Sequence, residues 1–180
     1  MNTIVGVDLS THACGLAVFR DGVLHASWQL EVSDDRPWHR LYAMAARLAA
    51  HFPARPTLVV FEALRLFHAG RISLAALRDL GRLQGIVGLY AHQRGARVLE
   101  VAVQHWRKAV LGDGRATKDD VVRWARTFAR RTVATDEAEA IALAYYGHLW
   151  QTKKFRTSKG GTRCGTYHRA RTRSVDRRGP

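Results

Sequence analysis

The amino-acid sequence predicts an α/β domain with a five-stranded mixed sheet flanked by helices. Three apolar runs of strand length follow one another before residue 31, with short polar turns between them, which is typical of an antiparallel meander. After residue 37, strand-length runs alternate with longer segments of helical periodicity, as expected when helices pack on a sheet. A length of 180 residues suits one domain, and an apolar fraction of 47% is enough for a substantial core.

The first part of the chain predicts three antiparallel strands and one helix. The strands are expected at residues 3–9, 14–20 and 23–30. Asp21-Gly22 is a strong hairpin signal between the second and third strands, because both residue types tolerate the backbone of a tight turn. Pro37 opens a helix that extends to about His51, since apolar residues recur there at helical spacing.

The second part predicts two more strands and four helices. A β-branched and aromatic run at 57–61 ends in Glu62 and is typical of a strand buried on both faces. The other elements are a long helix at 71–93, a strand at 97–101, a short helix at 105–111, a helix at 118–129 and a last helix that Thr135 caps and that runs to about Trp150.

Three glycines interrupt the long helix, at Gly81, Gly85 and Gly88. Each glycine costs a helix roughly 1 kcal/mol relative to alanine, so their spacing of four and three residues indicates a close backbone approach to another element. That element is either the neighbouring helix of a dimer or the protein's own sheet.

The net charge of +14 is concentrated at the C-terminal end. Residues 152–180 hold ten Lys and Arg residues against one Asp, a net +9, which leaves +5 for the rest. This distribution favours a polyanionic partner, most simply nucleic acid, with a solvated tail of no specific role as the alternative. Because apolar periodicity ends there, we divide the chain into a folded domain at 1–151 and a basic DNA-binding tail at 152–180, predicted to be disordered without a ligand.

Several classes of protein are disfavoured by composition. No run of 18 apolar residues exists and no basic region precedes an apolar stretch at the N-terminus, so we expect neither a membrane span nor a signal peptide, and the cytoplasm is the default compartment. Cys14 and Cys164 are the only cysteines, too few for a disulfide framework or a zinc site.

Acidic residues stand at the ends of apolar elements, where packing alone does not favour a charge. Asp8 ends the first strand and Glu62 ends the fourth, while Asp136 and Glu139 share one face of the first turn of the last helix and Glu137 points elsewhere. Asp8 capping a turn, and the helix acids serving the helix dipole, are the simpler alternatives. If the four converge, their oxygens suit Mg²⁺ or Mn²⁺, and two such ions promote phosphodiester hydrolysis. A basic surface around an acidic pocket is the expected charge distribution of a metal-dependent nuclease.

An ordered set of short segments resembles the RuvC family of Holliday junction resolvases over roughly residues 3–150. The matching segments are Gly6-Val7-Asp8, residues 15–18, Val59-Val60-Phe61-Glu62, residues 81–85, residues 110–118 and residues 136–140. The resemblance implies an RNase H-like fold, a homodimer, and Mg²⁺-dependent paired nicking of four-way DNA junctions, with no small-molecule organic cofactor. It also implies that Asp8, Glu62, Asp136 and Glu139 are the catalytic, metal-binding acids for two Mg²⁺ ions per active site, with Mn²⁺ as a substitute.

The resemblance also assigns basic residues. Lys118 matches a basic residue near the active site, and Arg107 stands where the family tends to have Lys. The residues expected to contact DNA are Arg65, Phe67, Arg71, Arg107, Lys108, Arg115, Lys118, Lys153, Lys154 and Arg156. The chain departs from the family at Glu139, where Asp is usual, and at the junction wedge, for which Phe67 is the nearest aromatic after Glu62. Its Arg-rich tail suggests a phage or plasmid variant.

Three other functions remain open. Asp8-Leu9-Ser10-Thr11 resembles the first phosphate loop of sugar-kinase-like phosphotransferases, but 180 residues leave no room for their two lobes. A nucleic-acid-binding module with a relic acidic site is disfavoured by the four well-placed acids. A related nuclease that cuts RNA or other branched DNA fits the same residues.

Overall fold

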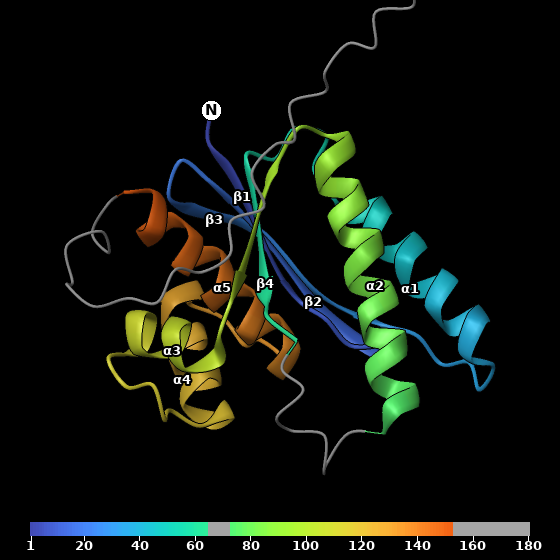
Figure 1. Cartoon of the computed structure of the whole chain (residues 1–180). Coiled ribbons are helices and arrows are strands. Elements are labelled where there is room, and N and C mark those ends of the chain that lie inside the picture. The colour runs from blue at the N-terminus through green and yellow to red at the C-terminus, as the bar shows by residue number, and fades with distance from the viewer. Residues whose placement is uncertain (65–72, 153–180) are drawn as a thin grey trace, which may run out of the picture.

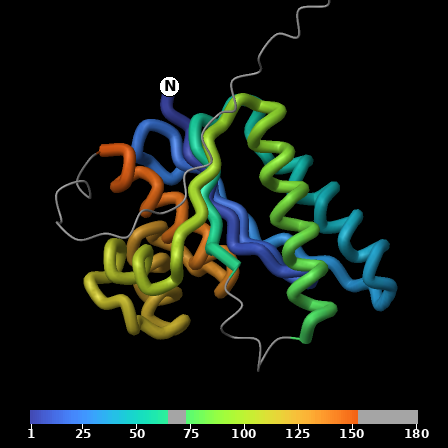
Figure 2. The backbone as a smooth tube through the Cα atoms, in the orientation of Figure 1, coloured from blue at the N-terminus to red at the C-terminus, as the bar shows by residue number. Residues whose placement is uncertain are grey.

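A computed structural model describes residues 1–64 and 73–152 (Figure 1). Within them, the predicted five-stranded mixed sheet is confirmed, with strand order β3-β2-β1-β4-β5. The strands are β1 (Thr3–Asp8), β2 (Ala13–Arg20), β3 (Val23–Glu31), β4 (Leu58–Glu62) and β5 (Arg97–Val101). β1, β2 and β3 pair antiparallel, whereas β4 pairs parallel with both β1 and β5. Figure 2 shows β1 and β4 running side by side at the centre, although they lie far apart in the sequence.

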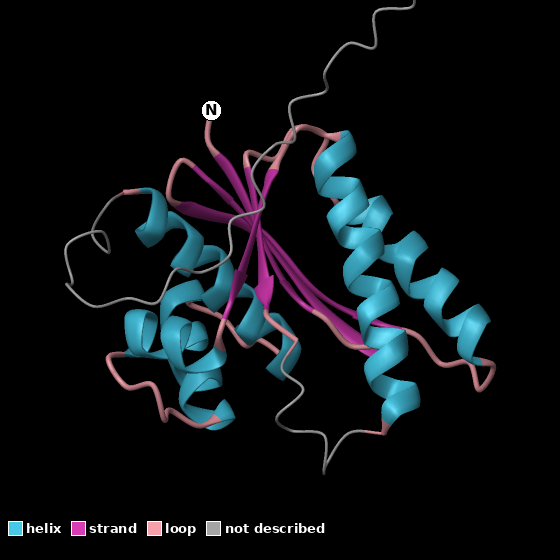
Figure 3. Ribbon diagram, viewed as in Figure 1, coloured by secondary structure: helices cyan, strands magenta, loops and turns pink. Residues whose placement is uncertain are grey.

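Helices cover both faces of the sheet (Figure 3). α1 (Pro37–His51) and α2 (Leu74–Gln93) lie on one face. α3 (Val103–Leu111), α4 (Lys118–Ala129) and α5 (Thr135–Gln151) lie on the other. Each face has its own buried apolar cluster, so the sheet separates two core layers. No helix in the described residues is long and apolar enough to span a membrane.

The predicted element boundaries need small corrections, which the helix caps explain. α2 begins at Leu74 rather than residue 71, because the Ser73 hydroxyl caps it by accepting a hydrogen bond from the Ala76 N–H at 3.1 Å. α3 begins two residues earlier than predicted, at Val103. The cap residue of α5 is Ala134 and not Thr135, since the Ala134 N–H is satisfied by the Glu137 carboxylate.

Side-chain alternation in the two central parallel strands decides where their acids point. In β1, Ile4 belongs to the layer under α3–α5, while Val5 and Val7 belong to the layer under α1 and α2. Because successive side chains of a strand point to opposite faces, Asp8 falls on the α3–α5 side with Ile4. β4 alternates in the same way, and Glu62 falls on that side too.

Glycines let α5 lie unusually close to the sheet. A Cβ atom on Gly15 of β2 would collide with the backbone carbonyl of Asp136, and one on Gly6 of β1 would collide with the Ala140 carbonyl and the Ala144 amide. Small residues on both sides of this contact place the first turn of α5 directly against the end of β1. Asp136 is thereby brought to the edge where Asp8 lies.

The glycines of α2 have different surroundings. In the described part of the chain, a Cβ on Gly85 or Gly88 would meet no atom within 4 Å, and one on Gly81 would meet only Leu64 at 3.8 Å. Packing on the protein's own sheet therefore does not explain Gly85 and Gly88. Among residues 1–64 and 73–152, nothing covers the backbone at these two glycines within 4 Å of such a Cβ.

Candidate metal centre

Asp8 and Glu62 occupy adjacent positions at one end of the sheet. Val7 of β1 pairs with Phe61 of β4, so the next residue of each strand, an acid in both cases, stands beside the other. Both carboxylates point toward α3–α5, as the alternation of buried residues requires. The parallel pairing of two strands that each end in an acid is what places them together.

Helix α5 adds the other two predicted acids. Glu139 is buried and Asp136 is half-buried in its first two turns. Burial raises the pKa of Asp8 well above its usual range, and the charge of Glu139, a hydrogen bond to it, and the charges of Glu62 and Asp136 raise it further. The structure thus brings all four predicted acids into electrostatic contact around Asp8.

The environments of Glu62 and Asp136 also disfavour an isolated negative charge. Burial raises the pKa of Glu62, a hydrogen bond from Trp106 works in the opposite direction, and the charge of Glu139 adds to the rise. For Asp136, burial raises the pKa, Lys118 opposes the rise, and Glu139 adds to it. These are carboxylates whose ionised form a nearby cation would stabilise.

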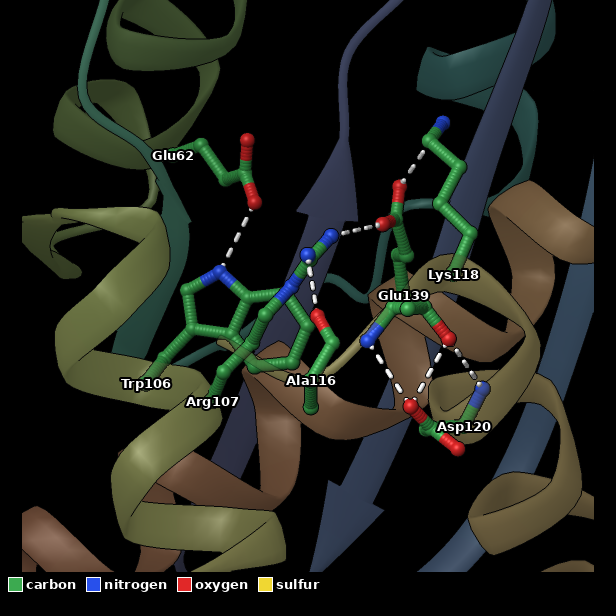
Figure 4. A network of polar contacts seen from close by, with 8 residues as sticks. Glu62, Trp106, Arg107, Ala116, Lys118, Asp120 and Glu139 are labelled. Carbon is green, nitrogen blue, oxygen red and sulfur yellow. Dashed lines mark hydrogen bonds and ion pairs between the residues drawn. The ribbon is translucent and has the colours of Figure 1, made fainter. Parts of the chain in front are cut away.

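Two basic side chains hold Glu139 (Figure 4). Arg107 Nη2 donates to Glu139 Oε1 at 2.9 Å, while its Nη1 donates to the backbone carbonyl of Ala116 at 2.6 Å. Lys118 Nζ lies 3.5 Å from Glu139 Oε2. Burial alone would lower the pKa of Lys118, but Glu139, Asp8 and Asp136 raise it overall, so the ammonium group stays charged.

The oxygen atoms of these carboxylates are of the chemical type that binds a hard divalent cation. In residues 1–64 and 73–152, no three His, Cys, Asp or Glu side chains are already arranged to hold a metal ion. Both oxygens of Glu139 face Arg107 and Lys118, and one oxygen of Glu62 accepts from Trp106. The remaining oxygens belong to carboxylates with raised pKa values, and carboxylate oxygen is the ligand that Mg²⁺ and Mn²⁺ prefer.

Glu137 turns away from the other acids, as predicted. Its Oε1 accepts hydrogen bonds from Ser27 Oγ at 2.8 Å and from Arg131 Nη2 at 2.5 Å, and its Oε2 accepts from the Ala134 N–H at 3.3 Å. Burial would raise the pKa of Glu137, but the hydrogen bonds from Arg131, Ser27 and Ala134 lower it overall. This buried carboxylate ties the first turn of α5 to β3 and to the preceding loop, a role that the sequence alone does not reveal.

The predicted DNA-contacting residues fall into three groups. Lys108, Arg115 and Lys118 are exposed, and Lys118 lies beside Glu139. Arg107 has only 15% of its side chain exposed and uses two guanidinium nitrogens inside the protein, so its main contact is with Glu139. The others lie outside the described residues: Arg65, Phe67, Arg71, Lys153, Lys154 and Arg156, with the rest of the predicted basic tail.

Trp106 is a further residue of the site that sequence reasoning missed. Its side chain is fully buried, and its indole N–H donates to Glu62 Oε1 at 2.7 Å. One property of the sequence could have identified this residue. A buried indole N–H usually needs an acceptor, and Trp106 lies in a short helix directly after β5.

Comparison with known proteins finds no matching family model, but it finds related proteins. A crossover junction endodeoxyribonuclease RuvC from an Anaeromyxobacter species is 31% identical over 145 residues, covering 78% of this chain and 69% of the relative. The RuvC of Bdellovibrio bacteriovorus is 28% identical over 159 residues, covering 84% and 92%.

Solved structures agree in fold. Thermus thermophilus RuvC matches with a TM-score of 0.68 at 20% identity, over 84% of this chain and 96% of that one. The same protein in complex with a Holliday junction substrate matches with a TM-score of 0.67 at 18% identity, with the same coverage. A yeast mitochondrial Holliday junction resolvase matches with a TM-score of 0.54 at 13% identity, over 85% and 81% of the two chains. These likenesses confirm the predicted RNase H-like architecture.

Proposed function

Because the chain belongs to the RuvC family of crossover junction endodeoxyribonucleases, we propose that it is a metal-dependent endonuclease that resolves four-way DNA junctions by paired symmetric nicks. The observation that carries the proposal is the convergence of Glu62, Asp136 and Glu139 on Asp8 at one end of the sheet. These are the four acids that the family resemblance assigns to metal binding. The relatives' names support a junction substrate.

Asp8, Glu62, Asp136 and Glu139 would hold Mg²⁺, with Mn²⁺ as a substitute and two ions per site. When bound, such ions activate a water and stabilise the leaving oxygen of a phosphodiester. Asp8 and Glu62 come from adjacent strand ends, so the strands fix their separation, while α5 fixes the other two acids from the opposite side. The unfavourable charge that these groups share supports binding of a divalent cation.

The basic residues of the site have separate tasks in this proposal. The Lys118 side chain is 62% exposed and lies beside the acids, so its ammonium group can contact the phosphate of the strand to be cut. Arg107 is partly buried and orients Glu139 through a charge-assisted hydrogen bond. Exposed Lys108 and Arg115 contribute phosphate contacts that carry no sequence information.

Junction resolution needs two coordinated cuts, so we propose a homodimer whose symmetry axis relates two such sites. The open backbone face at Gly85 and Gly88 of α2 supports this, since it allows a second helix to approach closely. We assign the nuclease to residues 1–151 and additional phosphate binding to the basic segment 152–180, whose net charge is +9.

The proposal is tested by cleavage of a synthetic four-way junction labelled in turn on each strand. Linear duplex, flap DNA, single-stranded DNA and RNA serve as competing substrates, each with Mg²⁺ and with a chelator. We expect Mg²⁺-dependent cuts at symmetric positions in two opposite strands of the junction alone. Cleavage of RNA or flap DNA in preference to the junction would favour a related nuclease, and phosphoryl transfer to a sugar would favour a kinase-like enzyme.

A further inference from the structure

We propose that Trp106 is a positioning residue that orients Glu62 toward the metal centre through its indole N–H. The inference rests on the proposed function, because it concerns the same four acids. It starts from the hydrogen bond between Trp106 Nε1 and Glu62 Oε1, which is 2.7 Å long and lies beneath the site (Figure 4).

The donor is fixed in place by the core. Trp106 is fully buried in the layer between the sheet and α3–α5. The guanidinium carbon of Arg107 lies 5.2 Å from the centre of the same indole ring and covers part of it. An indole held in this way cannot follow the carboxylate if the carboxylate moves, so the hydrogen bond restrains Glu62 and not the reverse.

The acceptor needs such a restraint. Glu62 is the last residue of β4, and a glutamate side chain can rotate about several single bonds. The hydrogen bond fixes Oε1 against α3 and leaves Oε2 outside this contact, on a side chain that points with Asp8 to the same face of the sheet. One oxygen therefore serves for orientation, and the other is available as a ligand.

The chemical nature of the donor is suited to this task. An indole N–H donates a hydrogen bond but carries no charge and accepts no proton. A Lys or Arg in this position would pair its charge with Glu62, as Arg107 and Lys118 do with Glu139. Trp106 orders the carboxylate while leaving its negative charge for the metal.

The arrangement also relates Glu62 to Glu139. Trp106 and Arg107 are consecutive residues of α3, and the first binds the acid of β4 while the second binds the acid of α5. One short helix, α3, thereby fixes the positions of two of the four acids relative to each other, although these acids come from different elements. Loss of the Trp106 hydrogen bond alone should release Glu62 and leave Glu139 in place.

The decisive variant is Trp106→Phe, which keeps an aromatic ring in the core but removes the N–H. Calorimetric titration of the full chain with Mn²⁺, without DNA, should show affinity reduced by about tenfold, a typical effect of losing a hydrogen-bond partner of a metal ligand. The Mg²⁺ concentration for half-maximal junction cleavage should rise by a similar factor, while cleavage at saturating Mg²⁺ changes much less. Trp124→Phe is the matched control, because Trp124 stacks on Phe128 in α4 and should leave both values unchanged.

A spectroscopic measurement on the wild-type chain covers the case in which Trp106→Phe does not fold. In ¹⁵N-labelled protein, one indole N–H resonance should shift during a Mg²⁺ titration with the same midpoint as metal binding, and Glu62→Gln should alter that resonance. Unchanged Mn²⁺ affinity in a folded Trp106→Phe variant, or the absence of any indole shift as Mg²⁺ saturates, would overturn the inference. A wild-type chain that binds Mn²⁺ and shows this indole shift with Mg²⁺ but leaves junctions intact would instead overturn the proposed function alone.

Discussion

Asp8 of β1 lies close enough to Glu139 of α5 that the charge of Glu139 adds to the rise in the pKa of Asp8 that burial causes. Burial and this neighbouring charge both disfavour the ionised form of Asp8. The ionised carboxylates of this site therefore repel one another, and a bound cation would relieve that repulsion.

Asp8→Asn should abolish junction cleavage while leaving junction binding largely intact, because it removes a metal-binding charge and no DNA-contacting residue. Gel-shift assays in a chelator and cleavage assays in Mg²⁺ measure the two properties on the same substrate. Glu62→Gln, Asp136→Asn and Glu139→Gln should behave alike. Normal cleavage by Asp8→Asn would refute the assignment of the metal centre.

The same Asp8→Asn change should stabilise the protein in metal-free buffer at neutral pH. A carboxyl whose folded-state pKa is raised opposes folding once the pH exceeds its unfolded-state value, and the amide has no such effect. A rise in Tm of a few degrees is expected, since about 1 kcal/mol corresponds to roughly 2–4 °C in a chain of this size. Excess Mg²⁺ should reduce this advantage, and a lower Tm for the variant would contradict the prediction.

Glu137→Gln should destabilise the chain, and the effect should depend on pH in the opposite direction. The folded-state pKa of Glu137 is lowered, so its contribution is fully present above the unfolded-state pKa and disappears as the pH falls through the folded value. Removal of its charged hydrogen bonds with Arg131 and Ser27 should cost about 1.5–3 kcal/mol at pH 7, and less at a pH low enough to protonate Glu137 in the folded protein. Urea unfolding at the two pH values measures this, and an equal effect at both would show that the charge is not responsible.

Gly15→Ala should damage the metal centre without changing any acid. Its Cβ would overlap the Asp136 backbone carbonyl, and backbone cannot yield as a side-chain end can. We expect a decrease in stability of about 3 kcal/mol or more, together with weaker Mn²⁺ binding in whatever fraction remains folded. A variant with wild-type stability and wild-type cleavage would mean that α5 does not pack against β2 as described.

Gly85→Ala should have opposite effects on the stability of one chain and on the association of two chains. Within one chain the new Cβ meets open space, so the helix should gain about 1 kcal/mol in stability. In a dimer that packs through this face, the added methyl should weaken association. Sedimentation velocity at micromolar concentration should show a stable monomer population in the variant and a dimer in the wild type. A wild-type chain that is monomeric and fully active would contradict the dimer.

Deletion of residues 152–180 should weaken binding to junction and duplex DNA alike. The net charge of this segment, +9, favours binding to phosphates, so log affinity should depend less steeply on log salt, by roughly 0.9 for each phosphate that the truncated chain no longer neutralises. Cleavage at saturating DNA should survive, since none of the four acids lies there. A selective decrease in preference for the junction would instead indicate that Tyr167, His168 and the arginines near them recognise its shape.

The strands, and the positions of Asp8 and Glu62 at the ends of two of them, could be predicted from the sequence because their signals are local. An apolar run that ends in a carboxylate is visible at Asp8 and at Glu62 without knowledge of the fold. The partners of those acids could not be found in this way. Trp106 reaches across 44 positions to Glu62, and Arg107, expected to contact DNA, turns inward because Glu139 and the Ala116 carbonyl lie within its reach. Such contacts depend on how α3 is rotated against the sheet, which periodicity leaves undetermined.

The separation of the core into two layers has a consequence for how this protein can change. The apolar cluster beneath α1 and α2 shares the strands with the cluster beneath α3–α5, but their side chains point to opposite faces. Substitutions in the α1 and α2 layer therefore alter side chains that point away from the face on which Asp8 and Glu62 lie, so this layer can vary without replacing any of the four acids. Insertion or deletion of one residue inside β1 is the exception, because it would turn Asp8 to the wrong layer in a single mutational step.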